Sequence, residues 1–222
     1  MSYSLEKYKT LVFDCDGVVL NSNKVKTDAF YQAALSYGEQ AAQALVEYHV
    51  ANGGVSRYKK FAYFLNTLVP QYAAGVSGST REELLDAYAR YVLKGLLTCD
   101  IAEGIHELRK NTHNTNWLIV SGGDQAELRY VFAERGLAEY FDGGIFGSPD
   151  TKDEILEREI NNGNIQQPAL FLGDSKYDYQ ASNGAGLDFV FLTGWTEVEG
   201  WEEWCNQYCL ISVDSIEKLL GA

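Results

Sequence analysis

Two aspartates stand one residue apart near the start of the chain, at the end of an apolar run. The stretch from Phe13 to Ser22 reads FDCDGVVLNS and contains Asp14 and Asp16. A carboxylate can attack phosphorus and form an acyl phosphate, which divides one difficult displacement into two easier ones. Because two close carboxylates do not both ionise cheaply, we expect the pKa of Asp16 to be raised, so that Asp16 protonates a leaving alkoxide and then deprotonates water. The alternative is an acidic turn that only ends a strand.

Two glycine-containing segments provide backbone that a phosphoryl group can approach closely. Gly17 directly follows Asp16 and has no Cβ to hold phosphoryl oxygens away. The segment SGG at 121–123 offers the Ser121 hydroxyl and flexible backbone N–H groups, including that of Gly122, close to a predicted helix start. Such groups can form an oxyanion cradle, although SGG is also compatible with an ordinary loop.

Lys152 occupies an unusual position for a lysine. The segment TKDE at 151–154 is typical of a helix start, with Thr151 as N-cap and Glu154 three residues later. A cation in the first turn of a helix is disfavoured by the helix dipole. The position becomes favourable if the Lys152 ammonium reaches the carboxylates and pairs with the phosphoryl charge. A lysine exposed at the surface is the alternative.

The segment GDSKYD places Asp174 and Asp178 four residues apart. Together with Asp14 they predict an oxygen-rich site of the kind that holds Mg²⁺ with several retained waters. A metal ion there would reduce the repulsion between Asp14 and an anionic phosphate. Asp178 could instead serve only as the acidic residue that suits a helix N-terminus.

Five apolar runs predict the strands that position these groups. Helix-like stretches such as 126–137 and 153–160 separate the later runs, and this alternation predicts an α/β fold with a Rossmann-like parallel sheet covered by helices on both faces. Ligands bind such sheets outside the carboxyl ends of the strands, which is where the polar groups above fall. The runs span 9–14, 116–122, 142–148, 169–175 and 188–194.

Residues 23–98 interrupt this alternation, because they contain no strand pattern. They predict four helices, at 24–37, 39–51, 55–68 and 81–97, with a loop from Pro70 to Ser79. We therefore expect an all-helical cap domain over 23–98, inserted into a core formed by 1–22 and 99–222. The segments Leu20–Asn23 and Thr98–Ile101 are the expected hinges.

The composition of the whole chain limits the kinds of partner that the protein is expected to bind. The chain has 222 residues, 46% of them hydrophobic, and a formal net charge of −13. This charge argues against a nucleic-acid partner, and it means that an anionic substrate needs a local positive pocket. No segment reaches the roughly 20 continuous apolar residues that span a bilayer, and residues 1–9 lack the apolar region of a signal peptide. The four cysteines fit neither a disulfide framework nor a zinc site, so we expect reduced thiols and a cytoplasmic location.

The motifs together resemble the haloacid dehalogenase superfamily, in its branch with a helical cap inserted after the first strand. The resemblance covers essentially the whole chain and rests on FDCDGVVLNS, VSGG, the Lys152 region and FLGDSKYDYQASNGAG, in this order. The branch is that of the phosphoglycolate phosphatases and β-phosphoglucomutases. The resemblance implies a Rossmann-like core, dependence on Mg²⁺ and an aspartyl-phosphate intermediate.

The resemblance also implies a role for individual residues. Asp14 matches the nucleophile and metal ligand, and Asp16 matches the acid/base that also binds the metal through its backbone carbonyl. Ser121 and Lys152 match the positions that bind the phosphoryl group. Many relatives have proline after this lysine, whereas this chain has Asp153.

The remaining matched positions concern the metal and the substrate. Asp174 matches the metal position, and Asp178 a further ligand or a group that supports one. The segment GGVSRYKK at 53–60 places Arg57 and Lys60 on one face of a predicted cap helix, where they could bind a distal anionic or polyhydroxy group. Its GVSR sequence is similar to the cap loop of β-phosphoglucomutases. A solvated basic edge is the alternative.

We therefore expect a Mg²⁺-dependent phosphomonoesterase that acts on a small phosphorylated metabolite, of the phosphoglycolate or sugar phosphate class. A sugar phosphomutase uses the same Asp14 and Asp16 chemistry and is the nearest alternative. A dehalogenase fits less well, since a departing halide needs no acid. A phosphoacceptor domain that signals without turnover is the alternative from a different class. The sequence does not specify the oligomeric state.

Overall fold

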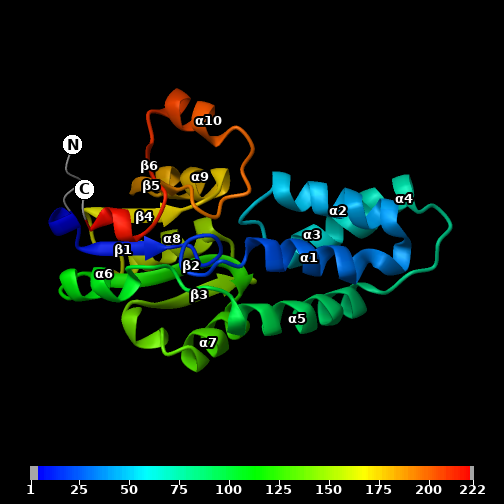
Figure 1. Cartoon of the computed structure of the whole chain (residues 1–222), viewed down its shortest axis with the longest axis horizontal. Coiled ribbons are helices and arrows are strands. Elements are labelled where there is room, and N and C mark those ends of the chain that lie inside the picture. Colours follow the sequence, from blue (N-terminus) through cyan, green and yellow to red (C-terminus); the bar gives the residue numbers. More distant parts are fainter. Residues whose placement is uncertain (1–4, 221–222) are drawn as a thin grey trace.

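A computed structural model describes residues 5–220 and contains one six-stranded parallel sheet (Figure 1). The strand order is β3-β2-β1-β4-β5-β6, so β1 lies in the middle of the sheet with β2 and β4 as its neighbours. The strands are β1 (Thr10–Phe13), β2 (Asn116–Asp124), β3 (Gly144–Ser148), β4 (Ala169–Gly173), β5 (Asp188–Leu192) and β6 (Ile211–Val213).

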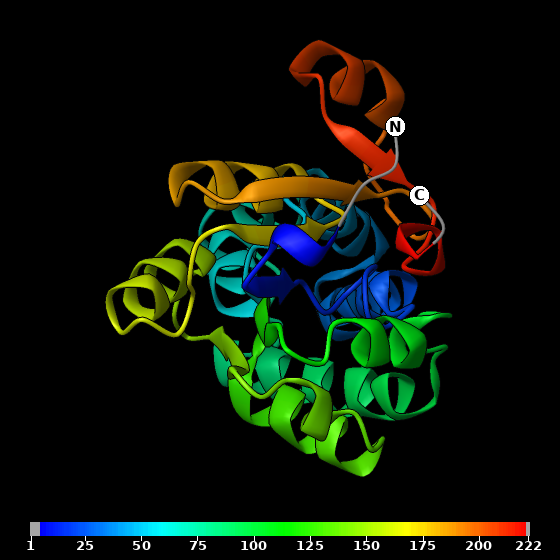
Figure 2. The same cartoon turned by 90° about the vertical axis from the view of Figure 1, so that its left-hand side faces the viewer.

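Helices cover both faces of this sheet, as the continuous apolar strands predicted (Figure 2). Every residue of β1 and β4 is buried, which is the burial expected of central parallel strands. On one face Leu11 and Phe13 pack in the same cluster as residues of α6 and α7, and on the other Val12 packs with residues of α8 and α9. The core helices are α6 (Ile105–Asn111), α7 (Gln125–Glu134), α8 (Lys152–Asn161), α9 (Lys176–Gly184) and α10 (Trp201–Tyr208).

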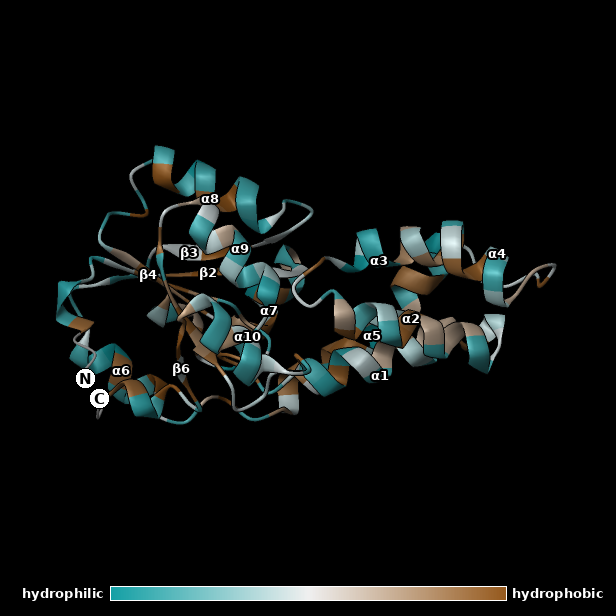
Figure 3. Ribbon diagram, turned by 90° about the horizontal axis from the view of Figure 1, so that it is seen from above, coloured by the Kyte–Doolittle hydropathy of each residue, from teal (hydrophilic) through white to brown (hydrophobic). Residues whose placement is uncertain are grey.

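Residues 23–98, between β1 and α6, form a separate group of helices that lies beyond the carboxyl ends of the strands (Figures 1 and 3). The Phe30 ring is the centre of their apolar contacts, with ring centroids at 4.4 Å from Tyr88 and 5.2 Å from Phe61. The helices are α1 (Asn23–Ala34), α2 (Glu39–Ala51), α3 (Arg57–Tyr63), a π-helical turn (Phe64–Leu68), α4 (Val69–Tyr72) and α5 (Arg81–Thr98). Short 3₁₀ turns occur at Leu5–Lys7, Leu35–Tyr37, Ala138–Tyr140 and Glu217–Leu219.

The structure confirms the predicted fold class and the five predicted strands, and it differs from the sequence prediction in two places. The edge strand β6 was missed, because its three residues are not an apolar run and Ile211 and Ser212 are exposed. The predicted loop from Pro70 to Ser79 begins too early, because Pro70 lies in the first turn of α4, where a missing N–H costs nothing.

Two further features bear on the sequence prediction. Within residues 5–220, no helix combines the length and the apolar character that a bilayer crossing requires. The four cysteines are free thiols, and burial, followed by the charge of Asp16, raises the pKa of Cys15 well above its usual value. The raised pKa disfavours the thiolate, which is the reactive form of a cysteine.

The long helix α5 begins with a capping box that offers a test of local stability. The Thr80 hydroxyl accepts a hydrogen bond from the Glu83 N–H, and the Glu83 carboxylate accepts one from the Thr80 N–H at 2.8 Å. We expect Thr80→Ala to lower the free energy of unfolding by about 1 kcal/mol, measured by urea denaturation. Ser77→Ala, in the exposed loop before the helix, is the matched control and should change it by less than about 0.5 kcal/mol. Equal effects of the two variants would contradict the assigned cap.

Candidate active site

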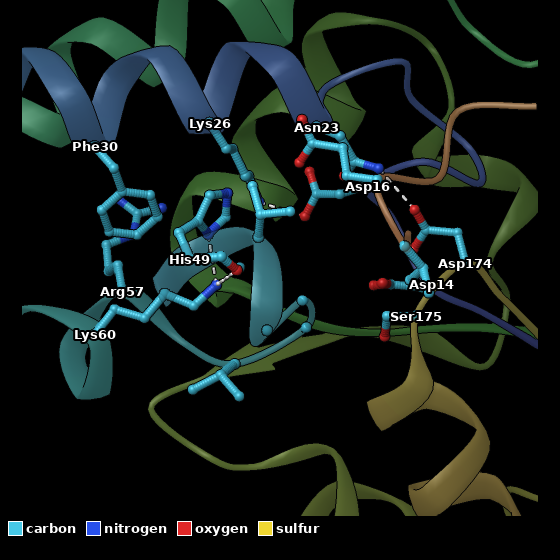
Figure 4. A pocket seen from close by; sticks show the side chains of 18 of the residues that line it. Asp14, Asp16, Asn23, Lys26, Phe30, His49, Arg57, Lys60, Asp174 and Ser175 are labelled. Atoms are coloured by element: carbon cyan, nitrogen blue, oxygen red, sulfur yellow. Dashed lines mark hydrogen bonds and ion pairs between the residues drawn. The ribbon is translucent and has the colours of Figure 1, made fainter. Parts of the chain in front are cut away.

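The predicted site residues gather where β1, β2 and β4 end, under the helices of residues 23–98 (Figure 4). A cavity of about 60 Å³ lies there between the sheet and those helices. Six predicted residues line it: Asp14, Asp16, Arg57, Lys60, Gly122 and Asp174. Four others lie just behind its wall: Gly17, Ser121, Lys152 and Asp178.

Lys152 is fully buried and holds two carboxylates together. Its Nζ lies 2.8 Å from Asp14 Oδ2 and forms a second, shorter ion pair with Asp178 Oδ1. Burial alone would lower the pKa of the Lys152 ammonium, but the charges of Asp14 and Asp178 raise it above its usual value. The first-turn lysine that is unfavourable for the helix dipole is thus stabilised by two acids, and the alternative of a surface lysine is wrong.

Asp14, Asp174 and Asp178 form a compact buried cluster in which one carboxylate oxygen from each lies within 4.8 Å of the others. Burial raises the pKa of Asp14 to about 7, against the lowering effect of Lys152, and the charges of Asp178 and Asp16 raise it further. Burial and the charges of Asp178 and Asp14 raise the pKa of Asp174 well above its usual value. One ammonium does not balance three buried carboxylates, so this donor set fits an added divalent cation with oxygen ligands.

Asp178 is the most constrained acid of this cluster. Its Oδ2 accepts hydrogen bonds from the Ser175 hydroxyl at 2.7 Å, the Ser175 N–H at 3.1 Å and the Asp174 N–H at 3.3 Å. Its Oδ1 is taken by Lys152. These partners use most of its acceptor capacity, so Asp178 is better suited to hold the β4–α9 turn and Lys152 in place than to bind a metal with both oxygens.

Asn23 was not predicted from the sequence, yet it contacts the acidic cluster directly. Its side-chain amide donates to Asp174 Oδ2 at 2.7 Å and to the backbone carbonyl of Trp195 at 2.8 Å. Asn23 is the first residue of α1, so it joins the helices of residues 23–98 to the acidic cluster at the carboxyl end of the sheet. An isolated asparagine carries no sequence pattern that could have revealed this contact.

Gly17 has a different structural role from the predicted one. Its backbone has φ of 72°, in the left-handed region that favours glycine, and a Cβ at this position would overlap the Asp174 carboxylate. Gly17 does not line the cavity. The missing side chain therefore makes room for Asp174, and the predicted contact with the phosphoryl group stays a prediction.

The Asp16 carboxylate turns away from the acidic cluster toward α1. It forms an ion pair with Lys26 and accepts a hydrogen bond from the Ser22 hydroxyl at 2.6 Å. Burial would raise the pKa of Asp16, but the charge of Lys26 and the hydrogen bonds from Lys26 and Ser22 lower it below its usual value. The expectation that proximity to Asp14 keeps Asp16 protonated is therefore wrong for this arrangement, because Lys26 reaches Asp16 from ten residues further along the chain.

The SGG segment contacts the cap loop that faces it. A Cβ on Gly122 would overlap the backbone carbonyl oxygen of Gly54, so only glycine permits this close approach. Ser121 is buried, and its Oγ accepts a hydrogen bond from the Gly123 N–H at 3.1 Å. Gly122 and Gly123 line the cavity, and the Ser121 hydroxyl lies behind them.

Arg57 and Lys60 both line the cavity and are buried, so the alternative of a solvated basic edge is wrong. The Arg57 guanidinium forms a two-point ion pair with Glu127 at the start of α7 and lies 4.7 Å from the centroid of the Tyr88 ring. Arg57 thus connects the helical insert to the core. Lys60 Nζ has a different partner, His49 Nδ1, at 2.6 Å.

The tryptophan-rich segment near the C-terminus, for which the sequence offered no function, packs on the core in this structure. The Trp204 ring contacts Tyr179 and Phe191 at centroid distances of 5.6 Å and 5.3 Å, and Trp201 stacks on Phe191 at 6.3 Å. These contacts hold α10 over β5 and α9. These contacts within the chain explain the presence of Trp201 and Trp204, so no binding partner is needed to explain these two residues.

Comparison with known protein families shows to which family the chain belongs. The model of the haloacid dehalogenase-like hydrolase family matches residues 8–186, which include every predicted catalytic and metal-binding position. The chain belongs to this family. The resemblance recognised from FDCDGVVLNS, VSGG, Lys152 and GDSKYD is thereby confirmed.

Individual relatives of this haloacid dehalogenase-like hydrolase span nearly its whole length. A phosphoglycolate phosphatase of Photorhabdus laumondii is 27% identical over 197 residues, which is 85% of this chain and 82% of the relative. A crystal structure of a "predicted phosphatase" from Clostridium acetobutylicum superposes with a TM-score of 0.73 at 19% identity, covering 96% of each chain. The β-phosphoglucomutase of Clostridium difficile superposes with a TM-score of 0.70 at 19% identity, over 96% of this chain and 93% of the other. At these identities the two structures establish a shared fold.

The buried Lys60 of this hydrolase makes its stability depend on pH. Burial, followed by the charge of Lys26, lowers the pKa of Lys60 to about 7. Between pH 7 and the usual lysine value the unfolded chain binds more protons than the folded chain, so stability rises with pH across this window. We expect Lys60→Met to stabilise the fold most at pH 6, on the order of 3–5 kcal/mol, with the gain shrinking toward pH 10.

Urea denaturation of the wild type and the variant at pH 6, 8 and 9.5 measures this effect. Lys59→Met is the matched control, because Lys59 is the preceding residue and is exposed. It should show neither the gain nor its pH dependence. A Lys60→Met gain that stays constant across the three pH values would contradict the depressed pKa.

Proposed function

We propose that this hydrolase is a Mg²⁺-dependent phosphatase that cleaves a small phosphorylated metabolite through an aspartyl-phosphate on Asp14. The observation that carries the proposal is the position of Asp14. Its carboxylate lines the cavity, pairs with Lys152 at 2.8 Å and lies in the buried cluster with Asp174 and Asp178. The similarity to a phosphoglycolate phosphatase over 85% of the chain supports a phosphomonoester as substrate.

The residues suited to hold the metal are Asp14 and Asp174, with Asp178 orienting them and the backbone carbonyl of Asp16 as the further ligand that the family resemblance implies. Bound Mg²⁺ would withdraw negative charge from the phosphoryl oxygens and so reduce their repulsion of Asp14. Asn23, which donates to Asp174, holds that carboxylate in a single orientation.

In the proposed reaction an oxygen of Asp14 bonds to phosphorus while the bond to the substrate alcohol breaks. Lys152, the Ser121 hydroxyl and the Gly122 N–H are proposed to stabilise the charge on the transferred phosphoryl group. Water then attacks the aspartyl-phosphate and releases inorganic phosphate and free Asp14. The charge of Lys152 favours the ionised form of Asp14 that attacks, and it opposes the larger effect of burial on the pKa of Asp14.

Asp16 is proposed to donate a proton to the leaving alkoxide and to recover one from the attacking water. Without substrate its pair with Lys26 favours the ionised form. A negatively charged phosphoryl group brought next to Asp16 disfavours that form, because like charges raise the pKa of a carboxyl. The arrival of substrate would thus help to protonate the acid that the reaction needs.

We further propose that residues 23–98 act as a cap that moves on the core formed by 1–22 and 99–222. The two connecting segments lie side by side, since Leu20 and Ile101 form an antiparallel bridge and the Asn21 N–H donates to the Asp100 carbonyl at 2.9 Å. A paired two-segment hinge allows rotation while keeping both connections in register. Closure brings the Gly54 loop against Gly122 and excludes water from the phosphoryl group.

A sugar phosphomutase is the second candidate, supported by the superposition on a β-phosphoglucomutase. A mutase would return the phosphoryl group from Asp14 to a second oxygen of the substrate instead of to water. One observation favours the phosphatase: Arg57 of the GVSR segment is already paired with Glu127. Release of inorganic phosphate, as opposed to an isomeric sugar phosphate, distinguishes the two.

Asp14→Asn is expected to abolish phosphate release from every phosphomonoester while the fold is retained. The amide keeps the shape of the carboxylate but is not a nucleophile, so the loss should exceed about 10⁴-fold in kcat. Phosphate release in the presence of Mg²⁺ measures it, with circular dichroism as the check on folding. Undiminished turnover would rule out Asp14 as the nucleophile.

Asp16→Ala is expected to slow hydrolysis in proportion to the basicity of the leaving alcohol. An alkyl phosphate needs a proton on its leaving oxygen, and we expect its kcat to fall by about 10²–10⁴-fold. The p-nitrophenolate ion leaves without one, so p-nitrophenyl phosphate should lose much less. Asp28→Ala, an exposed acid on α1, is the control. Equal losses for the two esters would count against the acid role.

A further inference from the structure

The end of the cavity away from Asp14 is basic, although the protein carries a net charge of −13. Figure 4 shows Asp14 and Asp174 at one end of the cavity, and His49, Phe30 and Lys60 at the other. The residues at this second end come from α1, α2 and α3, so the cap supplies them. This end faces the part of a substrate that leaves with the alcohol oxygen.

His49 has a buried nitrogen with no hydrogen-bond partner within residues 5–220. The residue is 8% exposed, its Nδ1 lies 2.6 Å from Lys60 Nζ, and the unpartnered atom is Nε2. When Lys60 is protonated its ammonium only donates, so Nδ1 of the neutral ring then accepts from Lys60 and Nε2 carries the hydrogen. Burial, followed by the charges of Lys60 and Lys26, lowers the pKa of His49 well below its usual value and keeps the ring neutral. A buried N–H without an acceptor is costly, which indicates that a ligand supplies one.

Among the described residues Lys60 lacks a counter-ion at this end, although its Nζ donates to His49 Nδ1 and to the His49 carbonyl oxygen at 3.4 Å. It is 1% exposed, and in the described part of the chain no carboxylate lies within 4.0 Å of its Nζ. The two other lysines buried near the site differ, because Lys26 is paired with Asp16 and Lys152 with Asp14 and Asp178. A buried ammonium without a counter-ion is unfavourable. An incoming anion would neutralise the charge of Lys60, which no carboxylate in residues 5–220 pairs with.

Glu197 is an acid that could act as this counter-ion, but its carboxylate has another partner. Glu197 lines the cavity, but its carboxylate oxygens accept from the Thr27 hydroxyl at 3.0 Å and 3.2 Å. Burial raises the pKa of Glu197, which further weakens it as a partner for Lys60. Arg57 is likewise unavailable to a ligand, because Glu127 neutralises it.

We propose that His49 Nε2 and Lys60 Nζ bind a carboxylate on the alcohol part of the substrate. The substrate class is then a small phosphorylated hydroxy acid and not a neutral sugar phosphate. A carboxylate has one oxygen for the imidazole N–H and one for the ammonium, so it can pair with both groups at once. This inference rests on the proposed phosphatase function, of which it specifies the substrate.

Two phosphate esters that differ in one group test the proposal. 2-Phosphoglycolate carries a carboxylate where 2-hydroxyethyl phosphate carries a hydroxymethyl group. We expect the wild type to have a kcat/KM roughly 10- to 100-fold higher for 2-phosphoglycolate, the range of one charge-assisted contact. Lys60→Met should bring the ratio of the two kcat/KM values close to one, whereas Lys59→Met should leave the ratio at the wild-type value. A wild-type ratio near one, or a ratio that survives in Lys60→Met, overturns the proposal.

His49 has its own pair of variants. His49→Phe keeps a flat ring next to Phe30, whose centroid lies 4.5 Å from that of His49, but removes the N–H donor. His49→Gln places an amide N–H close to the position of Nε2. We expect the preference for 2-phosphoglycolate to fall at least fivefold further in the Phe variant than in the Gln variant. Equal ratios in the two variants would assign His49 to packing alone.

Binding separates this proposal from the proposed function. In the Asp14→Asn background with Mg²⁺, calorimetry should show tighter binding of 2-phosphoglycolate than of 2-hydroxyethyl phosphate, and adding Lys60→Met should remove the difference. Preferential binding together with a wild type that hydrolyses neither ester would uphold the carboxylate site and overturn the phosphatase. Hydrolysis of both esters with equal binding would uphold the phosphatase and overturn the carboxylate site.

Discussion

The contact of one buried ammonium with two buried carboxylates governs the whole site. Lys152 lies between Asp14 and Asp178, and all three side chains are almost completely removed from solvent. Moving three charges out of water is expensive, and the mutual attraction repays that cost only when the groups are held at close range. The sheet, the α8 capping box and the Ser175 hydrogen bonds to Asp178 provide this constraint. Because Asp14, Asp174 and Asp178 outnumber the one ammonium, the arrangement leaves an excess of negative charge that suits a bound cation. Of the two carboxylates paired with Lys152, Asp14 lines the cavity.

The cap presents the complementary charge. Lys26, Arg57 and Lys60 are all buried over the acidic end of the sheet, although the protein as a whole is strongly negative. Lys26 and Arg57 are neutralised within the protein, by Asp16 and Glu127, and they join cap to core. Lys26 and Arg57, which are paired with carboxylates, therefore hold the cap over the core. Lys60, which has no carboxylate partner in the part of the chain that the structure describes, faces the cavity.

Much of the fold and part of the site followed from the sequence, for physical reasons. Continuous apolar runs can be buried only in a covered parallel sheet, and polar residues at their carboxyl ends must share one edge. Asp14, Asp174 and Lys152 therefore converge in the structure as predicted. The expectation of a raised pKa for Asp16 was wrong because it considered only the neighbour of Asp16 along the chain. The sequence also did not reveal the structural partners of Gly17 and Arg57, since Asp174 and Glu127 approach them from distant segments.

The sequence by itself determined the α/β class, the helical insert, the family and the acidic residues at the strand ends, because these depend on local periodicity and on short motifs. Only the tertiary structure decided which charges are paired. Pairing depends on distances of a few ångströms between residues far apart in the chain, and burial decides how much each pair matters. Lys59 and Lys60 are identical residues in adjacent positions, yet one is solvated and the other lies next to His49 in the cavity. That difference exists only after α2 and α3 have packed together.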